Sequence, residues 1–125
     1  MDPITLLLRK AQKYLRSAAV LLEMEDYDST VSRAYFAMFY AAQALVKRHG
    51  LRLAPGQTLR DAFVARFVQN GPLPERAAQA LEEGYQLMEL GDFAHTFGVS
   101  GPQAETMLAE AEAFVNSVSA LAETA

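Results

Sequence analysis

The stretch "SRAYFAMFYAAQAL", residues 32–45, has the composition of a helix that is buried on most of its surface. Its length and its alanines favour a helix over a strand, and a helix that is apolar nearly all round must be covered on most sides. One small bundle has few places in which to cover such a helix. We therefore expect a homodimer or larger assembly, with residues of this helix near its interface.

The composition is that of a single folded domain, residues 1–125. The 125 residues are enough to bury a core without disulfides or metal, and 51% of them are apolar, too many for a disordered chain. No apolar run reaches the length of about eighteen residues that a membrane helix needs, and the opening "MDPITLLLRKAQKYLR" becomes charged too early for a signal peptide. We expect a soluble, cytoplasmic protein that does not enter a membrane.

The sequence predicts no metal site and no cofactor. It has no cysteine, which excludes a disulfide framework and thiolate ligands. Its only imidazoles are His49 and His95, and neither has a partner at the spacing typical of a metal site. Both histidines are therefore interpreted as structural.

Charge is distributed unevenly along the chain. Residues 1–76 hold all eleven Lys and Arg against seven acids, a net charge of +4, whereas residues 77–125 hold eight acids and no Lys or Arg. If the two halves lie on different faces, the basic one suits phosphate and the acidic one suits another protein. Alternatively, the halves face each other in the bundle and neutralise one another.

Five segments carry helix signals, and none alternates polar and apolar residues with the period of a strand. We expect helices over residues 3–24, 28–48, 58–70, 74–91 and 100–125, with Asp2, Asp28, Thr58 and Ser100 as N-caps of the first, second, third and fifth. Gly84, on the apolar seam of the fourth, indicates a close approach by another helix. The first helix turns a basic stripe outward, normally no more than a solvated face: Arg9, Lys10, Lys13 and Arg16. The sequence predicts an all-α fold.

The second helix carries a polar and aromatic stripe. Arg33 and Tyr40 are seven residues apart, two turns of a helix, and therefore share one face. Gln43 and Lys47 continue that face toward the end of the helix. Such a stripe fits a subunit interface, where Arg and Tyr are enriched. It fits equally well a nucleotide site, with Arg on phosphate and Tyr on base or ribose.

A purely structural interpretation of the arginine is also open. In that interpretation Arg33 pairs with an acid such as Asp92 or Glu89 and takes no part in binding. The spacing of the residues does not choose between the three interpretations.

The segments "YDSTVSRAYFAMFYAAQALV" at residues 27–46, "GDF" at 91–93 and "AEAFV" at 111–115 resemble the HEPN superfamily, in particular its stand-alone bacterial and archaeal members. The resemblance implies an up-and-down bundle of four or five helices that dimerises. It also implies a frequent genetic partner, a minimal nucleotidyltransferase, in a toxin-antitoxin pair. Many members are metal-independent ribonucleases that use an Arg followed after four to six residues by His. Arg33 matches that arginine.

The histidine of the family pattern is missing. Where similar sequences carry His, this chain has Tyr40. An imidazole exchanges protons near pH 7, whereas a phenol, with a reference pKa of about 10, is a poor general base there. Tyr40 can still stack on a base or donate a hydrogen bond, so binding survives this change better than cleavage.

Three functions follow as hypotheses. The first is a non-catalytic interaction module that homodimerises, partners a minimal nucleotidyltransferase and binds nucleotide or RNA. The second is a metal-independent endoribonuclease toxin, in which Arg33 stabilises the phosphorane and Tyr40 or another group moves the proton. The third is a structural bundle without a ligand. No catalytic residue is assigned, and the candidates for a nucleotide, RNA or subunit interface are Arg33, Tyr35, Tyr40, Gln43, Lys47 and Asp92.

Overall fold

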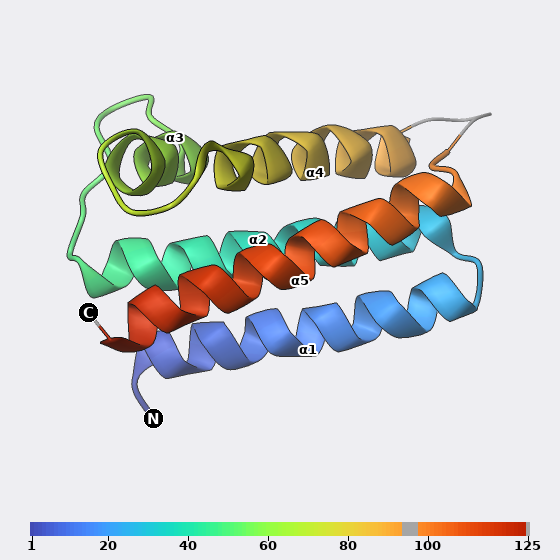
Figure 1. Ribbon diagram of the computed structural model, residues 1–125, viewed down its shortest axis with the longest axis horizontal. Coiled ribbons are helices and arrows are strands. Elements are labelled where there is room, and N and C mark those ends of the chain that lie inside the picture. The colour runs from blue at the N-terminus through green and yellow to red at the C-terminus, as the bar shows by residue number, and fades with distance from the viewer. Residues whose placement is uncertain (94–97, 125) are drawn as a thin grey trace.

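Every element that the structure describes is helical (Figure 1). The computed structural model describes residues 1–93 and 98–124. Its helices are α1 (Pro3–Glu23), α2 (Tyr27–Arg48), α3 (Leu59–Phe63), the π-helical segment η1 (Val64–Gln69), α4 (Glu75–Phe93) and α5 (Gly101–Thr124). No strand occurs in these residues, and the predicted all-α fold is confirmed. Within the same residues, no helix is long and apolar enough to cross a bilayer.

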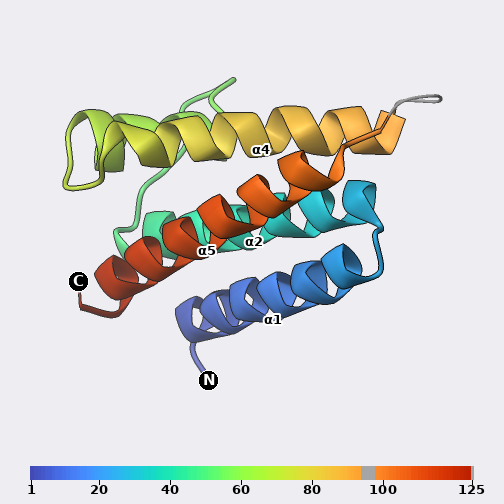
Figure 2. The ribbon, with the colours of Figure 1, turned by 45° about the vertical axis from the view of Figure 1, so that its right-hand side comes forward.

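The four long helices form an up-and-down bundle around α2. Helices α1, α4 and α5 all pack against α2, and successive long helices run in opposite directions. In Figures 1 and 2, α5 lies against one side of α2, with α1 and α4 to either side of it. Eleven residues of α2 are buried, five of them alanines. The helix that was expected to need cover on most sides therefore forms the centre of the core.

Three of the predicted helix starts are confirmed. Each is a side-chain oxygen that accepts a hydrogen bond from a backbone N–H of the first turn, which satisfies a group that the helix itself cannot pair. These caps are Asp2 for α1, Thr58 for α3 and Ser100 for α5. All three signals are local in sequence, which is why spacing alone found them.

The predicted start of α2 is wrong by two residues. Asp26, not Asp28, is the N-cap and accepts a hydrogen bond from the backbone N–H of Ser29 at 3.3 Å. Glu25 has a φ of 61°, a left-handed conformation that turns the chain between α1 and α2 and lets α2 begin early. Asp28 instead accepts a hydrogen bond from the backbone N–H of Val99 at 2.7 Å. Its carboxylate ties the start of α2 to the segment that leads into α5.

The third predicted helix is present but not uniform. Helix α3 passes directly into η1, where the wider π-helical turn replaces the α-helical one. Asn70 Nδ2 donates a hydrogen bond to the carbonyl oxygen of Ala65 at 2.9 Å and so pairs a carbonyl at the end of this segment. The segment ends at Gln69, close to the stop predicted from the Gly-Pro pair at residues 71–72.

Close contact between α4 and α2 depends on two glycines. A Cβ atom on Gly84 would lie 2.7 Å from Met38 Cε and 3.4 Å from Tyr35 Cδ1, so the predicted close approach at this seam is confirmed. A Cβ atom on Gly91 would lie 3.2 Å from the Cα atom of Asp28. The glycine of the "GDF" segment therefore lets the end of α4 reach the start of α2.

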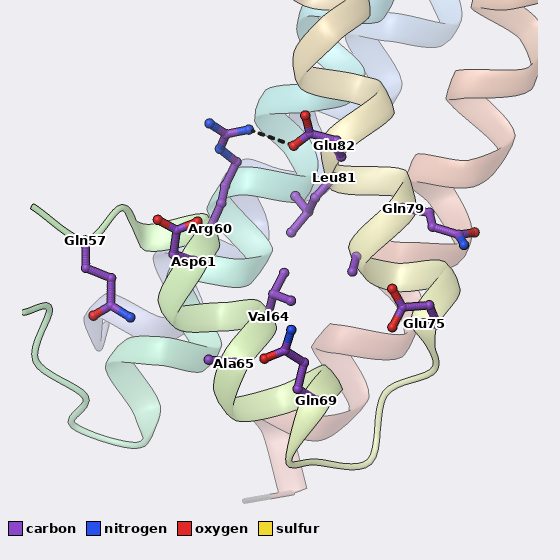
Figure 3. Close-up of a pocket in the computed structure, with 11 residues that line it drawn as sticks. Gln57, Arg60, Asp61, Val64, Ala65, Gln69, Glu75, Gln79, Leu81 and Glu82 are labelled. Atoms are coloured by element: carbon purple, nitrogen blue, oxygen red, sulfur yellow. Dashed lines mark ion pairs between the residues drawn. The ribbon is translucent and has the colours of Figure 1, made fainter.

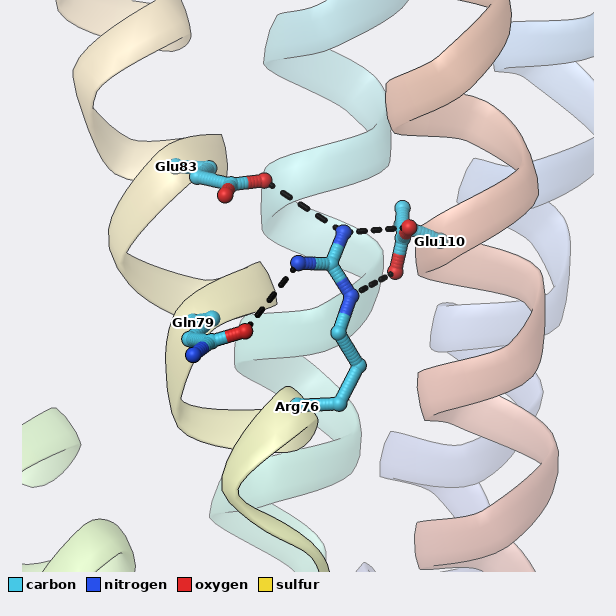
Figure 4. Close-up of polar contacts among 4 residues, drawn as sticks. All are labelled: Arg76, Gln79, Glu83 and Glu110. Atoms are coloured by element: carbon cyan, nitrogen blue, oxygen red, sulfur yellow. Dashed lines mark hydrogen bonds and ion pairs between the residues drawn. The ribbon is translucent and has the colours of Figure 1, made fainter.

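The basic and acidic halves meet at two arginines of the described chain. Arg76 binds Glu83 of α4 and Glu110 of α5, and its Nε donates to Glu110 Oε2 at 2.8 Å (Figure 4). These bonds raise the pKa of Arg76, the hydrogen bond to Glu110 first among them. Arg60 pairs with Glu82 at 3.6 Å. Both arginines pair with glutamates of α4 or α5, and the basic stripe of α1 takes no part in these ion pairs.

Candidate functional site

Two tyrosine rings and two cations form a continuous row along the seam between α1 and α2, with a cation at each end. The guanidinium carbon of Arg33 lies 4.6 Å from the ring centroid of Tyr14. Tyr14 meets Tyr40 edge to face, with centroids 5.2 Å apart and an interplanar angle of 82°. Lys10 Nζ lies 4.5 Å from the ring centroid of Tyr40. We call these residues, Arg33, Tyr14, Tyr40 and Lys10, the cation–aromatic ladder.

The ladder follows from two helical spacings. Arg33 and Tyr40 are two turns apart on α2, and one ring from the neighbouring helix fills the gap between them. That ring is Tyr14, which stands one turn after Lys10 on α1. The shared face of Arg33 and Tyr40 is thus as expected. Tyr14 and Lys10 were missed as site residues, and their only signal was a spacing of four residues at the edge of a stripe interpreted as solvated.

A basic groove adjoins the ladder between α1 and α2. It has a volume of about 440 Å³ and is lined by Lys13, Arg16, Ser17, Val20, Leu21 and Arg33, without a carboxylate. In the part of the chain that the structure describes, Lys13, Arg16 and Arg33 make no ion pair. Arg33 is also exposed. Three cations that no acid neutralises favour the binding of phosphate.

An aromatic row continues from the ladder across α2. From Tyr40 the row passes to Phe36 and Phe39, with ring centroids 6.3 and 6.0 Å from that of Tyr40, and then to Tyr35. Tyr35 in turn contacts Tyr85 of α4, 5.7 Å between centroids. Phe36, Phe39 and Tyr40 are only half-buried. The row therefore leaves apolar surface open on α2 between α1 and α4.

Two of the other sequence candidates stand apart from the ladder. Tyr35 is 4% exposed and packs toward α4, and burial raises the pKa of its phenol. Asp92 is exposed near the end of α4, and no ion pair to Arg33 exists among the described residues. Glu89 accepts a hydrogen bond from Tyr85, which raises the pKa of that phenol. The structural ion pair considered for Arg33, with Asp92 or Glu89, is therefore absent from the described chain.

The remaining candidates continue along α2. Gln43 is half-buried one turn beyond Tyr40, and Lys47 is exposed in the last turn. Both extend the face that carries Arg33 and Tyr40, as their spacing predicted. The ladder contacts do not reach either of them.

No imidazole stands beside Arg33 in the described residues. His49 follows α2 and packs edge to face on Phe67 of η1, with centroids 5.0 Å apart. Sixteen residues separate it from Arg33, about 24 Å along a helix axis at 1.5 Å per residue. His95 lies outside the described residues. Tyr40, and not an imidazole, stands two turns after Arg33 on the same face of α2.

Another cavity has the wrong charge for phosphate. It lies between the α3–η1 segment and α4, has a volume of about 650 Å³, and is lined by Asp61, Glu75 and Glu82 together with one cation, Arg60 (Figure 3). Arg60 is already engaged, because it pairs with Glu82 and lies 3.7 Å from the ring centroid of Tyr85. Three carboxylates against one paired arginine disfavour an anion. The groove beside the ladder is the better candidate.

Comparison with known proteins agrees with this architecture. A family model described as "HEPN domain" matches residues 4–121. The chain is 27% identical over 110 residues to "Putative toxin MJ0142" of Methanocaldococcus jannaschii, a match that covers 88% of this chain and 75% of that protein. It is 31% identical over 117 residues to a UPF0332 protein of Archaeoglobus fulgidus, a match that covers 92% of this chain and 91% of that protein. The crystal structure of TT1696 from Thermus thermophilus shares the fold, with a TM-score of 0.77 at 23% identity over 95% and 98% of the two chains. The chain belongs to the HEPN domain family.

Proposed function

We propose that this protein is a homodimeric interaction module that binds RNA or a nucleotide along the cation–aromatic ladder without cleaving RNA efficiently. One observation carries the proposal. The exposed guanidinium of Arg33 lies on the ring of Tyr14, opens onto a groove that it shares with two further cations, and has no carboxylate partner in the described chain. Arginine in this state forms bidentate hydrogen bonds with phosphate, and tyrosine rings stack on bases.

The absence of a proton-accepting group beside Arg33 in the described chain supports binding over cleavage. Metal-independent hydrolysis of RNA needs a group that takes a proton from the attacking hydroxyl near neutral pH. The phenol of Tyr40 does this poorly, and its ring is held between Tyr14 and Lys10. A cation next to an aromatic ring is suited to binding a phosphate and a base, and less suited to transferring a proton.

The half-buried rings of α2 support the homodimer. Phe36 and Phe39 lie on the strip of α2 between α1 and α4, where a second copy would cover them. Aromatic side chains and Arg are typical of interface centres. The proposal that a minimal nucleotidyltransferase is the partner rests on the family resemblance. Co-purification of the two chains after co-expression tests it. A cytoplasmic location stays a prediction.

Binding of a fluorescent single-stranded RNA, followed by anisotropy, tests the proposal. Arg33→Ala should raise the Kd about tenfold, which corresponds to about 1.4 kcal/mol. Arg52→Ala is the matched control, because Arg52 is exposed beyond the end of α2 and its loss changes the net charge equally. An equal effect of the two substitutions would mean that only net charge matters, and the proposed site would be wrong.

A second candidate function is that of a metal-independent endoribonuclease toxin. The name of the Methanocaldococcus jannaschii relative favours it. In that function Arg33 stabilises the phosphorane, and Tyr40 or another group moves the proton. Cleavage of RNA in the presence of EDTA, lost in Arg33→Ala, would establish it.

A further inference from the structure

A second basic groove lies on a neighbouring face of α1. It runs between α1 and α5, has a volume of about 480 Å³, and is lined by Thr5, Leu8, Arg9, Gln12, Arg16, Ser119 and Glu123. Thr5, Arg9, Gln12 and Arg16 stand three or four positions apart, so they form one stripe along the helix. Arg9 and Arg16 are exposed and make no ion pair with any residue that the structure describes.

The donors of this groove fit an anion. Two guanidinium groups and the amide of Gln12 supply N–H donors, and arginine matches the geometry of phosphate oxygens. On the α5 side, the buried Oγ of Ser119 has no hydrogen-bond partner within the described chain. Glu123 is the one lining group that opposes an anion.

Arg16 connects the two grooves. It lines both the α1–α5 groove and the α1–α2 groove beside the ladder, and Lys13 of the α1–α2 groove stands one turn before it. Arg9 and Arg16 are seven residues apart, about 10 Å along the helix axis. A stacked strand advances about 3.4 Å per nucleotide, so this separation corresponds to about three nucleotides.

We propose that the α1–α5 groove is a second phosphate-binding site, and that one RNA strand crosses α1 over Arg16 to occupy both grooves. This inference rests on the proposed function, because it takes the ladder as the first site. It adds that the ligand is a strand of several nucleotides rather than a single nucleotide. The stripe on α1 then serves as the path of the sugar-phosphate backbone.

Oligouridylates of two and twelve nucleotides, each labelled with a fluorophore, test the second site by anisotropy at several salt concentrations. Arg9→Ala should weaken binding of the 12-mer several-fold and leave the dinucleotide unchanged, because only the longer strand reaches Arg9. The slope of log Kd against log salt for the 12-mer should fall by about 0.7, the value for one phosphate of a single strand. Glu123→Gln should strengthen binding of the 12-mer, because it removes the carboxylate that opposes an anion. Arg52→Ala is again the control.

The outcomes separate the second site from the first. If Arg33→Ala weakens both oligonucleotides while Arg9→Ala and Glu123→Gln change neither the affinity nor the salt slope of the 12-mer, the second site is wrong and the proposed function stands. Equal weakening of the dinucleotide and the 12-mer by Arg9→Ala also contradicts a second site. If Arg33→Ala has no effect on either length, the proposed function fails and the inference falls with it.

Discussion

The guanidinium of Arg33 stacks on the ring of Tyr14, 4.6 Å from its centroid, and pairs with no carboxylate of the described chain. A guanidinium held by a ring keeps its N–H groups available, because the contact uses the face of the ring and not a hydrogen bond. In a structural ion pair those groups would already be occupied. Contact with a ring in place of a carboxylate distinguishes an arginine that can bind a ligand from one that only stabilises the fold. The two cases differ in the stability that the free protein loses when Arg33 is replaced.

Replacing Arg33 with Ala should cost little stability. An exposed cation–π contact contributes about 0.5–1 kcal/mol, whereas breaking a buried ion pair costs about 3–5 kcal/mol. We expect the free energy of unfolding in urea to fall by about 0.5–1 kcal/mol. A double-mutant cycle with Tyr14→Leu should assign most of that loss to the contact between the two side chains. A loss of several kcal/mol would show that Arg33 is structural after all.

Tyr40→His should create or raise metal-independent RNA cleavage. The substitution restores the Arg-then-His pattern on one face of α2, next to Arg33 and Tyr14. Because the imidazole must be neutral to accept a proton, cleavage should rise with pH through its pKa, about 6.5 for an unperturbed imidazole. The ammonium of Lys10, which lies over this position, should lower that pKa, since a like charge disfavours the imidazolium.

Tyr40→Phe is the control for that experiment. Phenylalanine keeps the ring but has no group that accepts a proton, so RNA should stay intact in this variant. If Tyr40→His folds, dimerises and binds RNA yet cleaves none at pH 7–8, the prediction that a histidine at this position enables cleavage is wrong.

The wild type should sediment as a dimer or larger species at micromolar concentration, and Phe36→Glu should make it monomeric. A charge on the open strip of α2 would be buried without a partner in the assembly. Leu90→Glu is the matched control, because Leu90 is 42% exposed on α4 and lines a groove between α4 and α5. Circular dichroism checks that both variants fold. A wild type that sediments only as a monomer would remove the argument for assembly.

Asp28→Ala should destabilise the fold without changing the ladder. Its carboxylate accepts the hydrogen bond from Val99 N–H at 2.7 Å, and its removal leaves that group unpaired in a partly buried place. An unsatisfied buried donor costs about 1–3 kcal/mol. Urea denaturation should show this loss, whereas RNA affinity should stay as in the wild type. Unchanged stability would mean that water replaces the carboxylate at no cost.

Local signals predicted most of the fold. The apolar character of residues 32–45, the capping pairs and the Gly-Pro stop each involve neighbours in sequence, and the structure bears them out. The residue type and position of Asp28 predict an N-cap. Its actual partner, Val99, is 71 residues away and could not be found by spacing. No residue pattern signalled the π-helical turn.

The site was predictable only in part. Spacing placed Arg33 and Tyr40 on one face, but Tyr14 belongs to another helix, and its place between them depends on how α1 rotates against α2. The same rotation decides which cations of α1 meet Arg33 in a groove. Neither the sequence of α1 nor that of α2 predicts by itself how the two helices pack against each other.

Incubation of wild-type protein with a labelled single-stranded RNA in EDTA at neutral pH, with anisotropy and strand length followed over hours, tests binding without cleavage most directly. We expect a bound RNA that stays intact, and we expect Arg33→Ala to weaken its binding about tenfold. RNA cut by the wild type and left whole by Arg33→Ala would contradict it, and would make Arg33 a catalytic residue of a ribonuclease.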